Sequence, residues 1–173
     1  THILRVVNSP AFRGSAEIVA LKQAIARLGM ERIREIALTI SLRGSLVSSG
    51  AFDDLIENAW SFGLRTALWA KEVARKARKN VEISYLCGLL HNVGVAVVVN
   101  RVRDLDIADL SKDDMQRLLQ RTAGEAGLVL IEQWGLPQLV SDCFKQADDD
   151  ASRDLFMVLE ASKQIAQWHA EDD

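Results

Sequence analysis

The chain has 173 residues, of which 49% are hydrophobic and 26% charged, values ordinary for a soluble globular domain with a sizeable core. Its net charge of −3 provides no overall attraction for nucleic acid or for an anionic membrane. No uninterrupted apolar run reaches the roughly 18 residues of a membrane-spanning helix, and only 2 prolines and 10 glycines argue against a turn-rich β fold.

Apolar residues recur every three to four positions along most of the chain, which favours helices. Residues 1–7 resemble the tail of an amphipathic helix without an opening cap, so we expect the chain to be a fragment of a longer protein. A short helix is predicted over 15–28. Gly29 should end it in the left-handed conformation. Another helix is predicted over 31–46.

The middle of the chain predicts two long helices. The first covers 53–79, with an acidic start and a basic end that suit the helix dipole. The second covers 83–100 and is apolar enough to be the buried centre of the domain, with Gly88 and Gly94 permitting close helix packing. The valines at 97–99 leave a strand open as the alternative for that segment.

The last third predicts three more helices. One covers 111–134, opens at the cap residue Ser111 and is closed by the Gly-Leu-Pro sequence at 135–137. The next follows that proline, and the final one, capped by Ser152, ends near 169. We therefore predict one compact all-α domain spanning residues 1–173.

The chain has two cysteines, Cys87 and Cys143, both inside apolar helical segments. This placement favours two buried reduced thiols over a disulfide, and it agrees with a reducing, cytoplasmic location.

Five motifs, in the same order along the chain, resemble the HDOD (HD-related output domain) family. Residues 88–94, Gly-Leu-Leu-His-Asn-Val-Gly, are similar to the family's Gly-Leu-Leu-His-Asp-Ile-Gly. The other four motifs are residues 4–12 with Asn-Ser-Pro-Ala-Phe, 21–38, 60–67, and 127–137 with Trp-Gly-Leu-Pro. The resemblance implies an all-helical HD-like fold, bacterial origin, a signal-transduction role, and further helical residues before position 1.

The HDOD family is similar to metal-dependent HD phosphohydrolases, whose sites need several His and Asp ligands to hold and activate a metal-bound water. Carried over from the resemblance, the first ligand position falls on Phe62 and the His-Asp pair on His91 and Asn92. The remaining positions fall near Ala123, near Ala147 and Asp148, and near Ser162. Only His91 keeps an imidazole, and the chain has just three histidines. We therefore predict a pseudoenzyme with no catalytic residue, no metal and no cofactor.

Two interpretations of His91 remain open. It is a buried, hydrogen-bonded core residue, or it belongs to a degenerate pocket that binds a small ligand or a nucleotide such as a cyclic dinucleotide. In the second case Phe62, His91 and Asn92 would line the pocket and Arg65 would contact a phosphate. An active phosphohydrolase with an unusual site is a further alternative.

Two surfaces are candidates for partner binding. Residues 22–33 superficially resemble a helix-turn-helix, with Arg32 and Arg34 on the second helix, but the basic excess is modest and Glu35 falls where an apolar packing residue is needed. These features argue against DNA binding. Trp69 faces away from Trp60 and is a candidate interface anchor. The predicted function is a non-catalytic regulatory module that binds a partner protein or a neighbouring signalling domain, of undetermined oligomeric state.

Overall fold

The structure is a computed structural model, and it describes residues 50–105, 110–145 and 149–171 together with Ala26 and Gly29. The chain divides into two compact units, residues 1–46 and 47–173, and the helices below belong to the second. Gly29 has φ +81°, which confirms its left-handed conformation. The helices predicted over 1–7, 15–28 and 31–46 lie otherwise outside the described residues, and the single domain over 1–173 remains a prediction.

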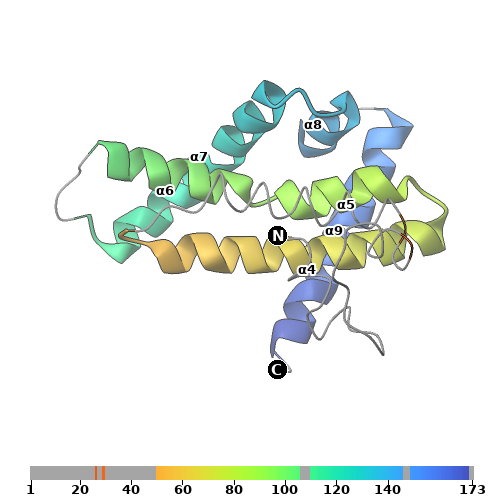
Figure 1. Ribbon diagram of the computed structural model, residues 1–173, viewed down its shortest axis with the longest axis horizontal. Helices are drawn as coiled ribbons and strands as arrows, with labels where there is room; N and C mark the ends of the chain where they lie inside the picture. Colours follow the sequence, from red (N-terminus) through yellow and green to blue (C-terminus); the bar gives the residue numbers. More distant parts are fainter. Residues whose placement is uncertain (1–25, 27–28, 30–49, 106–109, 146–148, 172–173) are drawn as a thin grey trace. The chain divides into compact units, whose positions relative to one another are not determined.

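Every regular element among the described residues is an α-helix, which confirms the predicted all-α class. Figure 1 shows α5 and α6 following one another alongside the long helix α4, with α9 crossing α4. The bounds are α4 Asp53–Ala77, α5 Val81–Leu90, α6 Val93–Asp104, α7 Lys112–Gln133, α8 Gln138–Lys145 and α9 Asp150–Glu171.

The prediction of a single helix over 83–100 was wrong, because the segment is broken at His91 and Asn92. Asn80 opens α5 by accepting a hydrogen bond from the Ile83 N–H at 3.0 Å. Asn92 has φ −111° and ψ 10°, outside helical geometry, and α6 begins at Val93. The apolar pattern continues through this break, so hydrophobicity alone gives no sign of it. The alternative strand at 97–99 is excluded, since these valines lie within α6.

The stretch Val81–Asp104 passes a length and composition test for a membrane-spanning helix, with a mean hydropathy of 1.6. Here the stretch forms two helices, and 56% of its most apolar 18-residue segment is buried within the protein itself. Such burial is also expected of core helices, so the stretch is weak evidence for membrane insertion.

Glycines permit the close helix crossings around this break, as predicted for Gly88 and Gly94. A Cβ added at Gly88 would lie 2.6 Å from the Cα of Ala67 on α4. One added at Gly94 would overlap the carbonyl oxygen of Ala123 on α7. No side chain larger than hydrogen fits at Gly94 unless the backbone moves.

The helix ends in the last third are set by local hydrogen bonds. Ser111 caps α7 as predicted, accepting from the Asp114 N–H at 3.1 Å. Gly135, with φ +62°, follows α7 and lets the chain turn toward α8. The predicted cap of α9 was wrong: Asp149 accepts from the N–H of Ser152 at 2.9 Å, so Ser152 lies inside the helix. The actual cap is therefore the middle residue of the acidic run at 148–150.

The helices pack so that α5 contacts α4, α8 and α9, while α6 contacts α4 and α7, and α7 also contacts α8. The junction between α5 and α6 is therefore surrounded by neighbouring helices. His91 lies at this junction.

Candidate functional site at the junction of α5 and α6

His91 is held by its own helix end. Its Nδ1 lies 2.7 Å from the carbonyl oxygen of Gly88. Because a carbonyl oxygen only accepts, Nδ1 carries the proton and donates it, and in the neutral ring Nε2 is then an acceptor. The Phe62 ring of α4 meets the imidazole edge-on, with centroids 5.2 Å apart and planes at 72°. Nε2 is buried and has no hydrogen-bond partner among the described residues.

The environment of His91 keeps its ring neutral. Burial lowers the pKa of His91 to about 4, against the opposing effect of the hydrogen bond to Gly88. The ammonium of Lys163 lowers this pKa further, and the carboxylate of Glu160 raises it. These two α9 side chains are paired with each other at 2.7 Å. The imidazole is therefore a fixed tautomer near neutral pH.

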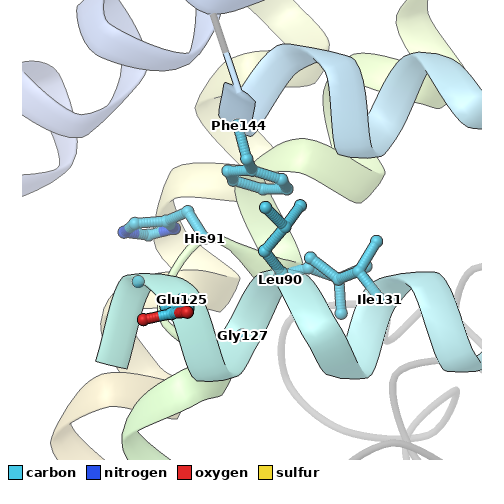
Figure 2. Close-up of a pocket in the computed structure, with 8 residues that line it drawn as sticks. Leu90, His91, Glu125, Gly127, Ile131 and Phe144 are labelled. Atoms are coloured by element: carbon cyan, nitrogen blue, oxygen red, sulfur yellow. The ribbon is translucent and has the colours of Figure 1, made fainter. Parts of the chain in front are cut away.

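A cavity of about 310 Å³ lies beside His91, between α5, α7 and α8 (Figure 2). In Figure 2 the His91 imidazole and the Glu125 carboxylate lie at one end, and Phe144, Leu90 and Ile131 lie at the other. The lining residues are Leu90, His91, Gly124, Glu125, Gly127, Leu128, Ile131 and Phe144. This volume falls within the usual range of small-molecule pockets.

Of the four residues predicted for a degenerate pocket, only His91 lines this cavity. Phe62 lies against the His91 ring, as the prediction implied, but does not line the space. Asn92 is half-buried at the start of α6 with no side-chain cap bond, and Arg65 is exposed on α4. The structure thus brings Phe62 to His91 and leaves Arg65 outside the cavity.

Sequence reasoning missed the α7 and α8 wall of the cavity. Gly124, Gly127, Leu128 and Ile131 follow one another at helical spacing, and two of them are glycines. The spacing was visible, but nothing in the sequence distinguished a stripe facing a cavity from one facing the core. Phe144 follows the predicted turn at Pro137 by seven residues and carried no separate signal.

The other carried-over positions that the structure describes, Ala123 and Ser162, do not offer side chains suited to bind a metal. The carbonyl of Ala123 faces Gly94, and the Ser162 hydroxyl donates to the carbonyl of Val158 at 2.6 Å within α9. Within the described part of the chain, no three His, Cys, Asp or Glu side chains gather in one place. The donors among the described residues therefore do not fit a phosphohydrolase metal site. The positions near Ala147 and Asp148 lie outside the described residues.

The two cysteines lie next to each other in the core. Cys87 of α5 and Cys143 of α8 are free thiols and fully buried. A hydrogen bond between the two thiols, together with burial, raises the pKa of Cys87. The reduced pair therefore holds α8 against α5 without a covalent bond.

Trp69 is half-buried and stacks on His169 of α9, with ring centroids 5.1 Å apart and planes at 6°. Trp168 contacts the same imidazole and is 63% exposed. The candidate anchor Trp69 thus forms part of an aromatic cluster of three residues with Trp168 and His169. Arg32 and Arg34, the other candidates for an interaction surface, lie outside the described residues.

Comparison with protein families gives one decisive match, since the model of the HDOD domain matches residues 1–149. The chain belongs to the HDOD domain family. This confirms the resemblance drawn from the five motifs. An uncharacterised protein of Treponema pallidum (strain Nichols) is 26% identical to this HDOD chain over 152 residues, covering 81% of the chain and 29% of that protein.

Solved structures confirm the fold of this HDOD chain. A Shewanella amazonensis SB2B protein provisionally assigned as a metal-dependent phosphohydrolase matches with a TM-score of 0.68 and 17% identity, over 92% of this chain and 61% of that one. An HDOD domain protein of unknown function from Geobacter sulfurreducens matches with a TM-score of 0.65 and 22% identity, over 94% and 59%. This HDOD chain therefore spans less than two thirds of the length of each of these three relatives.

Proposed function

We propose that this HDOD chain is a non-catalytic regulatory module of a bacterial cytoplasmic signalling protein, acting through contact with a partner protein or a neighbouring domain. The observation that carries the proposal is the edge contact of Phe62 with His91. A carbon ring occupies the position where the family resemblance places a metal-binding imidazole. One imidazole alone does not fix the geometry of a hydrolytic metal ion.

The neighbouring groups support the same conclusion. Asn92 is neutral, and the side chains at Ala123 and Ser162 supply a methyl group and a hydroxyl bonded to its own helix. Without a metal, no group near His91 is placed to lower the pKa of a water molecule to the physiological range. The geometry favours a scaffold whose surface is the functional part.

The aromatic cluster is the proposed contact surface within the described residues. Trp168 is 63% exposed and Leu68, next to Trp69 on α4, is 43% exposed. Exposed tryptophans are frequent anchors of protein interfaces, because they bury a large apolar area at a small cost in side-chain entropy. A partner with a complementary apolar pocket would cover them.

Metal analysis with a turnover assay tests the non-catalytic proposal. The purified chain is loaded with Mn²⁺, Fe²⁺ or Mg²⁺, desalted and assayed for bound metal, then incubated with bis-p-nitrophenyl phosphate and with cyclic dinucleotides. We expect substoichiometric metal and the same background rate for the wild type and for His91→Gln. Stoichiometric metal together with turnover lost in His91→Gln would establish the phosphohydrolase alternative.

The cavity beside His91 favours a second candidate function, small-ligand sensing. It is large enough for a small molecule and has an unpartnered buried acceptor in its lining residue His91. Ligand binding to the folded state raises the melting temperature. A thermal-shift screen that includes cyclic dinucleotides and guanosine polyphosphates tests the nucleotide version of this function, and an unchanged melting temperature at millimolar nucleotide would reject it.

A further inference from the structure

The chemistry of the cavity lining restricts what the cavity can hold. Most of its wall is apolar, formed by Leu90, Leu128, Ile131 and Phe144. The remaining side chains with polar atoms are His91 and Glu125. A ligand therefore needs an apolar body that replaces water along most of the wall and a polar group at one end.

Both polar side chains are acceptors. The hydrogen bond from Nδ1 to the Gly88 carbonyl leaves Nε2 of the neutral imidazole with a lone pair, and Nε2 is buried without a partner among the described residues. Glu125 is exposed at the rim and adds a carboxylate at the same end of the cavity in Figure 2. The group that satisfies them must donate hydrogen bonds.

The charge at the cavity disfavours a phosphate group. Its described lining contains neither Lys nor Arg. Lys163, which influences His91 from α9, is paired with Glu160 and does not line the space. Arg65 lies on the exposed surface of α4. A phosphate would bring charge toward the Glu125 carboxylate with no cation in the lining to compensate it.

We propose that the cavity between α5, α7 and α8 binds a small molecule with an apolar body and a protonated nitrogen, an ammonium or amidinium, directed at His91 and Glu125. The inference rests on the ligand-sensing function proposed above and gives it a ligand class. It is independent of the question of turnover, because it concerns the space beside His91 and not a metal site.

Three probes that share a phenyl body test the proposal: 2-phenylethylamine, 3-phenylpropionate and phenyl phosphate. Each is titrated into the intact chain, with binding followed by ligand-observed and protein-observed NMR. Ligands of this size bind with dissociation constants of about 1 mM. We expect saturable binding of the amine, with shifts of the His91 ring signals, and at least about tenfold weaker binding of both anions. Phenyl phosphate binding as tightly as the amine would overturn the proposal.

Two variants locate the amine. Glu125→Gln keeps an acceptor but removes the charge and should weaken amine binding about threefold or more. Asp113→Asn, which makes the same charge change at an exposed position of α7 outside the lining, is the matched control and should leave binding unchanged. Leu128→Trp should fill the cavity and abolish amine binding, while circular dichroism confirms that the variant is folded.

The remaining outcomes are decisive as well. If a folded Leu128→Trp binds the amine as the wild type does, or if Glu125→Gln and Asp113→Asn weaken binding equally, the amine binds the acidic surface and the proposal fails. If no probe binds saturably at about ten times the expected dissociation constant, the ligand class is wrong. That result leaves the non-catalytic function intact, since metal and turnover measurements alone decide it.

Discussion

Two glycines one turn apart on α7 stand in opposite surroundings. A Cβ at Gly127 would lie 3.1 Å from the backbone nitrogen of Gly94, whereas one at Gly124 would meet nothing within 4 Å. Both glycines line the cavity beside His91, but Gly127 also belongs to the packed crossing of α6 and α7, whereas a side chain at Gly124 would extend into open space. Glycine therefore permits backbone contact at one position and leaves open space at the other. We call the surroundings of His91 toward Gly94 and Phe62 its packed side, and the cavity bordered by Gly124 and Leu128 its open side.

The strongest test of the packed side is Gly94→Ala. The added methyl overlaps the carbonyl oxygen of Ala123, which belongs to a backbone and cannot rotate away. We expect a loss of about 3 kcal/mol or more in the free energy of unfolding, measured by urea denaturation.

Gly124→Ala is the control on the open side. Alanine is the better helix former and nothing obstructs its methyl group, so we expect a gain of about 0.5–1 kcal/mol. Equal losses for the two variants would contradict the distinction between the packed and the open side.

The pH dependence of stability tests the burial of His91. Its pKa of about 4 in the folded chain lies below the ordinary histidine pKa of 6.5, so the unfolded chain takes up the proton first as the pH falls. The His91 contribution is therefore fully present above pH 6.5, decreases as the pH falls toward 4, and is lost below that. We expect this loss to reach about 3 kcal/mol in denaturation curves. His91→Gln should lack it, and a stability difference between wild type and variant that stays constant with pH would contradict the prediction.

Phe62→Leu tests the aromatic contact on the packed side. Leucine keeps most of the apolar volume but removes the edge-on ring contact, and such aromatic contacts are worth about 0.5–1.5 kcal/mol beyond the area they bury. We expect a loss of that order in the free energy of unfolding and a change in the His91 ring signals in NMR. Unchanged His91 signals would show that the ring contact does not exist in solution.

Leu128→Phe tests the open side and should have the smallest effect. Enlarging a side chain inside a packed core usually destabilises a protein, but Leu128 borders free volume. We expect the free energy of unfolding, obtained from thermal denaturation, to change by less than about 1 kcal/mol. A loss comparable with that of Gly94→Ala would mean that the cavity is absent in solution.

The sequence predicted the helices better than their interruptions. The start of α4 at Asp53 and the cap of α7 at Ser111 followed from residue types whose preferences are local. The break at His91 and Asn92 did not, because apolar residues continue on both sides of it, and the close approach of Gly94 to α7 just after it is a tertiary contact that no local preference encodes. The position of Asp149 as the cap of α9 was obscured by the acidic run around it.

The candidate site was predicted at its centre but not along its wall. His91 and its neighbour Phe62 were recognised because the family resemblance places the first in the motif at 88–94 and the second at the first ligand position. The cavity was not, because it depends on how α7 and α8 approach α5, and no local preference encodes that distance. Arg65 was expected to face a ligand, yet the rotation of α4 exposes it to solvent.

The stack of Trp69 on His169 joins the middle of α4 to the last turns of α9. Indole fluorescence depends on the group stacked against the ring, so detachment of the end of α9 changes the emission of Trp69 even while the rest of the molecule stays folded. Helix ends open at a lower free energy than cores do. The pair therefore supplies an optical reporter, already present in the chain, for fraying at one end of this helix.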